Sequence, residues 1–109
     1  MSYNIIAVPA FRKELKKLAK KYHSLKTDLA VLFESLEENP TQGTSLGRNC
    51  YKIRLAISSK GKGKSGGARP ITNFVIADDT IYLLSIYDKS DKENLTDKEL
   101  DELLKYVPE

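Results

Sequence analysis

The sequence predicts an α+β domain in which helices pack on a small antiparallel sheet. Apolar residues recur at helical spacing through residues 10–39. The apolar period changes to two over residues 50–57, as in a half-buried strand. Two further apolar runs, 71–77 and 80–87, are close enough in sequence to continue an antiparallel meander. The predicted order is therefore β-α-α-β-β-β-α.

The N-terminal part predicts a short strand and then a helical hairpin on one face of the sheet. Residues 3–8 form an apolar run, and Pro9 suits the first position of a helix. Two apolar stripes follow, made by Phe11, Leu15, Leu18 and Tyr22 and by Leu25, Leu29, Leu32, Phe33 and Leu36. Ser24 is the expected N-cap of the second helix, and Pro40 is expected to end it.

The C-terminal part predicts two loops and a third helix. Residues 41–49 contain two glycines and no apolar alternation, so they are expected to form a loop. The glycine-rich stretch 60–69, "KGKGKSGGAR", is expected to be a second loop that leads into a strand. Thr96 and Glu99 in "TDKE" form a capping box, which predicts where the last helix begins.

Length and composition indicate one domain, residues 1–109, without a metal or cofactor. The chain has the size of a single-core domain, and 30% of its residues are charged. No apolar run is long enough to span a membrane, and no secretory apolar segment follows the first residue. One cysteine cannot form an internal disulfide, which favours the cytoplasm. One cysteine and one histidine are too few ligands for a structural zinc site.

Positive charge is concentrated in the middle of the chain. The net charge of +3 divides into +2 for residues 1–47, +5 for 48–87 and −4 for 88–109, and residues 48–77 contain no acid. Such a basic region suggests an anionic partner such as a nucleic acid. A solvated charged face is the alternative.

Six cations are expected to gather on one surface. Lys52 and Arg54 alternate onto the same strand face, and Arg69 begins the next strand, where it is expected to be exposed. The glycine-rich loop between them adds Lys60, Lys62 and Lys64. Clustered cations favour binding of phosphates, because condensed counterions are released. We expect a mobile loop that docks on RNA, and the alternative is a disordered tip with solubilising lysines.

Other candidate residues are weaker. The "GKS" at 63–65 is not a nucleotide P-loop, because Ser58 stands where the motif needs glycine. His23 is expected in the turn between two helices, and Cys50 has no histidine placed to activate it. Tyr87 ends a strand just before a charged turn, and core packing is its alternative role.

Four segments in this order resemble the RelE/ParE superfamily of toxins from type II toxin–antitoxin modules, especially its RelE/HigB-like branch. They are "FRKELKKLAKKY", "CYKIRL", "GKGKSGGAR" and "IYLLSIYDKSDKENLTDKEL", and together they cover nearly the whole chain. The resemblance implies a ribosome-dependent mRNA endoribonuclease that inhibits translation, uses no metal and is held inactive by an antitoxin.

The resemblance also implies which residues act. In this family, basic side chains orient the RNA while a 2′-hydroxyl attacks the adjacent phosphate. The corresponding catalytic positions are Lys52, Arg54 and Arg69, with Lys89, or failing that Lys92, in the turn after the last strand. RNA binding is expected from Lys92 and from the three loop lysines. The implied partners are a cognate antitoxin, the ribosome and mRNA, with no membrane and no cofactor.

The sequence departs from the RelE pattern at its acid–base residue. Leu95 stands near the position of the family's catalytic tyrosine, and there is no histidine near the C-terminus. Tyr87 is the first candidate to replace it, with Tyr82 and Tyr106 as alternatives. Two other functions stay open: a ParE-like toxin that inhibits a DNA topoisomerase without cleaving RNA, and a non-catalytic nucleic-acid-binding module.

Overall fold

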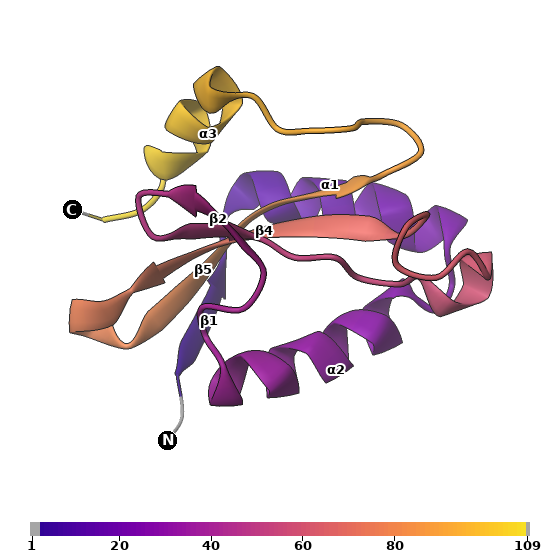
Figure 1. The fold of residues 1–109 in the computed structure, drawn as a ribbon, viewed down its shortest axis with the longest axis horizontal. Coiled ribbons are helices and arrows are strands. Elements are labelled where there is room, and N and C mark those ends of the chain that lie inside the picture. The colour runs from indigo at the N-terminus through magenta and orange to yellow at the C-terminus, as the bar shows by residue number, and fades with distance from the viewer. Residues whose placement is uncertain (1–2, 109) are drawn as a thin grey trace.

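Figure 1 shows the fold in a computed structural model, which describes residues 3–108. The elements are β1 (Asn4–Ala7), α1 (Pro9–Lys21), α2 (Leu25–Glu38), β2 (Thr44–Gly47), β3 (Cys50–Lys52), β4 (Ala68–Val75), β5 (Thr80–Asp88) and α3 (Asp97–Leu104), with short 3-10 turns η1 (Ser58–Lys60) and η2 (Ile76–Asp78). The five strands form one sheet in the order β1-β5-β4-β3-β2. Only β1 is parallel to its neighbour, β5. The predicted α+β class and the β3-β4-β5 meander are confirmed.

The helices divide between the two faces of the sheet. The hairpin of α1 and α2 packs on one face, where Phe11 and the leucine stripe of α2 are buried. Figure 1 shows α3 on the other side of the sheet from α2. Leu100, on the inner side of α3, is 2% exposed. No helix in the described range 3–108 has the length and apolar run needed to cross a membrane.

The loop predicted over residues 41–49 is wrong, because part of it is strand β2. This strand pairs with β3 through a tight turn at Arg48 and Asn49, whose φ angles are +52° and +60°. Two successive left-handed residues match the right-handed twist of a hairpin. β2 is mostly exposed at the sheet edge, so it has none of the apolar alternation by which a strand is recognised.

The strand predicted over residues 50–57 begins at Cys50, as expected, but its regular ladder ends at Lys52. Its pairing with β4 nevertheless continues, because the amide of Ile53 donates to Pro70 at 2.9 Å and that of Leu55 donates to Ala68 at 3.0 Å. The alternation predicted for this segment therefore still decides which side chains face α3.

Helix capping follows the prediction at α3 but not at α2. The capping box at the start of α3 is confirmed, because the Thr96 hydroxyl accepts from the Glu99 amide and the Glu99 carboxylate accepts from the Thr96 amide. Ser24 precedes α2 without capping its backbone. Its hydroxyl instead lies 2.9 Å from the Asp28 carboxylate and 2.9 Å from the Ser59 hydroxyl, so it links α2 to η1.

A buried carboxylate joins three distant segments of the chain. Asp88, whose side chain is 0% exposed, accepts hydrogen bonds from the Tyr22 hydroxyl at 2.5 Å, the Lys60 ammonium at 2.8 Å and the Ser90 amide at 2.9 Å. Burial alone would raise the pKa of Asp88. The hydrogen bonds and the charge of Lys60 outweigh burial and lower that pKa to about 2. The end of α1, η1 and the end of β5 are therefore held together here.

Acid should unfold the protein through this carboxylate. The pKa of Asp88 is lower in the folded than in the unfolded state, so its ionised carboxylate stabilises the fold at pH values above the unfolded-state pKa. This stabilisation is lost as the pH falls from about 4 to about 2. We expect Asp88 to contribute about 2 kcal/mol to the free energy of unfolding at neutral pH. Urea unfolding across this pH range should show that Asp88→Asn lacks this part of the pH dependence.

The matched control is Asp91→Asn, which changes an exposed carboxylate in the next turn. It should keep the acid sensitivity of the unchanged protein. Equal pH dependence in Asp88→Asn and the unchanged protein would contradict the assignment.

Candidate functional site

Strand register brings Arg69 and Tyr87 side by side. The two residues are direct partners in the antiparallel pair of β4 and β5, so their side chains share a face of the sheet. Lys52 pairs with Ile71, two residues along β4 from Arg69, and therefore lies on that same face. Arg54 lies two residues beyond Lys52, and its charge contributes to lowering the pKa of Arg69. Lys52, Arg54, Arg69 and Tyr87 thus share one face, the side on which α3 lies.

The expected exposure of Arg69 is wrong, because its guanidinium is enclosed. The residue is only 4% exposed, and Nη1 donates to the carbonyls of Lys64 at 2.8 Å and Ala68 at 3.0 Å. Burial is the main cause that lowers the pKa of Arg69, and the charge of Arg54 adds to it. Within residues 3–108, Arg69 forms no ion pair. A buried cation without a counter-ion is costly, and an anionic ligand would offset that cost.

Tyr87 presents an unpartnered phenol beside this arginine. The residue is 7% exposed, and its hydroxyl has no hydrogen-bond partner in the described part of the chain. Burial raises the pKa of Tyr87, and Arg69 only partly opposes the effect. The Lys92 ammonium lies 5.7 Å from the centre of the tyrosine ring. The phenol is therefore protonated at neutral pH and free to donate a hydrogen bond.

A cleft of about 490 Å³ opens at Tyr87 between β5, α1 and α3. Its walls include Ser85, Tyr87, Lys92, Leu95, Glu99 and Leu103, with Lys13 and Glu14 on the α1 side. The predicted tyrosine position at Leu95 is therefore a wall of the same cleft. Leu95 supplies an apolar surface there. The tyrosine that lines the cleft is Tyr87, which lies on β5.

The predicted lysines of the site have different partners. Lys52 donates to the side-chain oxygen of Asn94 at 3.2 Å, and Lys89 donates to the carbonyl of Glu93 at 3.1 Å. Lys92 forms an ion pair with Glu99 at the mouth of the cleft. Of the two alternatives for the turn after β5, the structure brings Lys92 to Tyr87, whereas Lys89 is held by its own turn.

Asn94 and Glu99, which hold Lys52 and Lys92, were not predicted as site residues. Asn94 gave no signal, because it lies in a polar stretch without periodicity. Glu99 was recognised only as part of the capping box, and its carboxylate also binds Lys92. Glu99 is the third residue of α3 and follows a turn that contains lysines. That position was the signal from which its contact with Lys92 could have been predicted.

The glycine-rich stretch has a defined course, which corrects the expectation for Lys60. This lysine lies in η1, and its side chain, 10% exposed, donates to Asp88 and to Ser90. It serves the fold, because its ammonium is already paired. Lys62 and Lys64 are exposed, as expected.

Cys50 and His23 stand apart from the site. The Cys50 thiol is fully buried, and burial raises its pKa. His23 lies exposed in the turn between α1 and α2. The described residues contain no group of three His, Cys, Asp or Glu side chains able to hold a metal ion.

Together, the fold and the site define a small α+β protein in which a buried arginine pairs across two strands with a tyrosine whose hydroxyl lacks a hydrogen-bond partner in the described residues. The model of the family described as "RelE toxin of RelE / RelB toxin-antitoxin system" matches residues 10–108. The chain belongs to this RelE family, the translation-inhibiting toxins of toxin–antitoxin systems. The resemblance stated from the sequence is thus confirmed.

Solved structures of Escherichia coli RelE share the fold. A mutant of that toxin with arginines changed to alanine, in the free state, matches with a TM-score of 0.65 and 18% identity, over 99% of this chain and 100% of that one. The isolated toxin in its P21 form matches with a TM-score of 0.53 and 18% identity, over 97% and 100%. The toxin in the intact RelBE toxin–antitoxin complex matches with a TM-score of 0.51 and 20% identity, over 80% and 96%.

Gly67 should be essential for placing Arg69. A Cβ at this position would lie 2.0 Å from the carbonyl oxygen of Leu55, so the backbone of β4 or of the preceding segment would have to move. We expect Gly67→Ala to lower the free energy of unfolding by about 1–3 kcal/mol. Thermal unfolding measures this loss. Ser65→Ala, at an exposed position two residues away, is the control and should change stability by less than about 0.5 kcal/mol. Equal stability of the two variants would contradict the close approach.

Proposed function

We propose that this toxin is an endoribonuclease that cleaves mRNA on the ribosome in the cytoplasm and so stops translation. The observation that carries the proposal is the pair of buried, incompletely partnered groups on β4 and β5. Arg69 has no counter-ion within residues 3–108, and the Tyr87 hydroxyl has no partner there. An RNA phosphate would satisfy both, because it supplies a negative charge and acceptor oxygens.

The proposed reaction is attack of a ribose 2′-hydroxyl on the adjacent phosphorus. A bond forms between O2′ and phosphorus as the 2′-hydroxyl loses its proton to water, and the bond between phosphorus and O5′ breaks. O5′ takes up a proton, which leaves a cyclic phosphate and a free 5′-hydroxyl. Negative charge builds on the phosphate oxygens as the nucleophile approaches. Arg69 and Arg54 stabilise that charge, and they do so most strongly where water is excluded. The low exposure of Arg69 meets this requirement.

Tyr87 fits the role of general acid in this reaction. The leaving O5′ needs a proton, and a phenol whose pKa is raised carries one at neutral pH. The same shift argues against Tyr87 as the base that deprotonates the 2′-hydroxyl. Lys92, next to the ring, would orient the phosphate, and Lys52 would do so from β3. Lys89 is the weaker candidate, because it is not among the residues that line the cleft at Tyr87, whereas Lys92 is.

The proposed partners follow from the family. One of the similar structures is the RelBE complex, in which a RelE toxin is bound to its antitoxin. We propose that a cognate antitoxin protein binds this chain as well and blocks the Tyr87 cleft. Lys62 and Lys64, which are exposed beside Arg69, would contact the RNA backbone and contribute affinity.

Tyr87→Phe should abolish cleavage without loss of stability. The change removes one hydroxyl that forms no hydrogen bond in the described structure, so the melting temperature should stay the same or rise slightly. Removing a general acid should slow cleavage by about 10²–10⁴-fold. Induced expression followed by mapping of transcript ends measures cutting within translated codons.

Tyr82→Phe is the matched control, because it makes the same change on the same strand at an equally buried tyrosine. It should cleave like the unchanged toxin. Loss of cleavage in Tyr82→Phe, with activity kept in Tyr87→Phe, would move the acid to Tyr82. DNA damage with intact transcripts on expression of the unchanged toxin would favour the topoisomerase alternative and overturn the proposal.

The three lysines of the glycine-rich stretch should have different roles. We expect Lys60 to stabilise the fold, and Lys62 and Lys64 to bind RNA. Lys60→Ser leaves Asp88 without its ion-pair partner and should cost about 3 kcal/mol of stability. The double change Lys62→Ser and Lys64→Ser should alter stability by less than about 0.5 kcal/mol but weaken ribosome binding and its salt dependence. Thermal unfolding and ribosome cosedimentation at several salt concentrations test both. The reverse pattern would contradict the assignment.

A further inference from the structure

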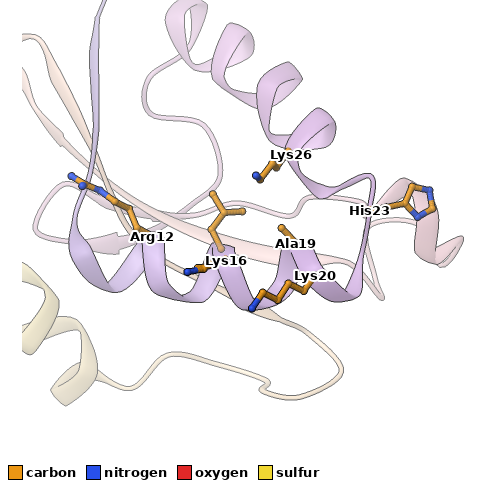
Figure 2. Close-up of a pocket in the computed structure, with 7 residues that line it drawn as sticks. Arg12, Lys16, Ala19, Lys20, His23 and Lys26 are labelled. Carbon is orange, nitrogen blue, oxygen red and sulfur yellow. The ribbon is translucent and has the colours of Figure 1, made fainter.

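A second cationic surface lies between α1 and α2, on the helices that cover the opposite face of the sheet from Tyr87. It is a groove of about 560 Å³, and Figure 2 shows the residues that line it. Its cations are Arg12, Lys16, Lys20 and Lys26, with His23 at the turn between the helices. Leu15 and Ala19 complete the lining, which contains no acid. The catalytic proposal uses none of these residues.

The charges of these four cations are not neutralised by carboxylates within the described part of the fold. None of the four takes part in an ion pair among residues 3–108. A lysine in the last turn of a helix, such as Lys20, stabilises the helix dipole. That explanation does not extend to Arg12, which lies in the first turn, where a positive charge opposes the dipole, or to Lys16 in the middle. All four side chains are exposed, so they are available to an external anion.

The arrangement of the cations fits a polymer rather than a single anion. Arg12, Lys16 and Lys20 follow one another at intervals of four residues, so each is displaced by about 6 Å along α1 from the one before. Figure 2 shows Lys26 reaching from the first turn of α2 towards this row. Arg12 is held in place, because Nε and Nη2 donate to the Ala7 carbonyl at 3.1 and 2.9 Å. The row of Arg12, Lys16 and Lys20 is therefore extended along α1, as are the phosphates of a polynucleotide backbone.

Two properties of the groove decide between the polyanions that it could bind. An amphipathic acidic helix needs several apolar anchor pockets, and the groove offers only Leu15 and Ala19, both already half-buried. Single-stranded RNA is usually held by aromatic side chains that stack on its bases, and no Phe, Tyr or Trp lines the groove. Double-stranded RNA presents its backbone and needs neither feature.

We propose that the α1–α2 groove binds the phosphate backbone of double-stranded RNA. The inference rests on the proposed function for its biological meaning, since the ribosome supplies RNA helices in abundance. One face of the toxin then holds structured RNA, while the face that carries Tyr87 acts on the message. The groove contributes affinity and orientation, and it takes no part in bond cleavage.

Fluorescence anisotropy with a labelled RNA hairpin of about 16 base pairs tests the groove directly. The groove variant carries Lys16→Gln, Lys20→Gln and Lys26→Gln, and glutamine keeps helix propensity close to that of lysine. We expect hairpin affinity at physiological salt to fall about tenfold or more. The slope of log affinity against log salt should become shallower by roughly two to three units, because each phosphate contact contributes at most about 0.9.

The control variant carries Lys17→Gln, Lys98→Gln and Lys105→Gln, which remove the same charge from exposed positions outside the groove, two of them in helices and one at the C-cap of α3. It should keep nearly the full salt slope. Equal losses in the two variants, or unchanged binding by the groove variant, would overturn the inference. A labelled polyglutamate peptide is the second probe. Groove-dependent binding of this peptide together with groove-independent binding of the hairpin would assign the groove to an acidic protein and overturn the inference as well.

Failure of the groove and failure of the proposed function are distinguishable. Tyr87→Phe should bind the hairpin like the unchanged toxin while it fails to cleave mRNA. If the groove variant loses the hairpin and the unchanged toxin leaves transcripts intact, the groove inference holds and the nuclease proposal fails. If transcripts are cut and the groove variant binds the hairpin normally, the nuclease proposal holds and the groove inference fails.

Discussion

The hydrogen bonds and ion pair around the buried Asp88 carboxylate organise the functional half of the molecule. They join the end of α1 through Tyr22 and the start of the glycine-rich stretch through Lys60 to the end of β5. Because side chains alternate along a strand, directing Asp88 towards α1 directs its neighbour Tyr87 to the other face. The amide of Lys89 also donates to Gly67, which precedes β4 and Arg69. The Asp88 carboxylate thus sets the direction of Tyr87, and it stabilises the turn whose Lys89 amide binds the segment before Arg69.

The residues of the candidate site lower the free energy of unfolding. Arg69 is buried without a counter-ion in the described structure, Arg54 repels it, and the Tyr87 hydroxyl makes no hydrogen bond there. Each of these features costs free energy in the absence of ligand. Such costs are typical of functional sites, where strain and unsatisfied groups are offset elsewhere. Here the ion pair of Asp88 and Lys60 stabilises the fold directly beside Tyr87, one of the groups that cost free energy.

Positive charge lies on two sides of the molecule, in two different settings. On the sheet face Arg69 is buried, and burial strengthens its electrostatic interactions. The α1–α2 groove spreads its cations along a helix in contact with water, where salt screens them and the effect is on affinity. The C-terminal segment carries most of the excess acid, and two of its carboxylates, those of Glu99 and Asp101, pair with Lys92 and Arg48. The α1–α2 groove has no such partner within residues 3–108.

The sequence by itself determined the features that are encoded within a few residues. Helical periodicity predicted α1 and α2, the Thr96–Glu99 box placed the start of α3, and alternation placed Lys52 and Arg54 on one face, because each of these depends on neighbours one or two turns away. Only the tertiary structure decided that Lys60 pairs with Asp88, 28 residues further along the chain, and that Arg69 is buried. It also decided that the edge segment Thr44–Gly47 is a strand and that Tyr87, rather than a residue at position 95, lines the cleft with its phenol. Burial and ion pairing depend on contacts between segments that are distant in the sequence, and local sequence patterns do not predict these contacts.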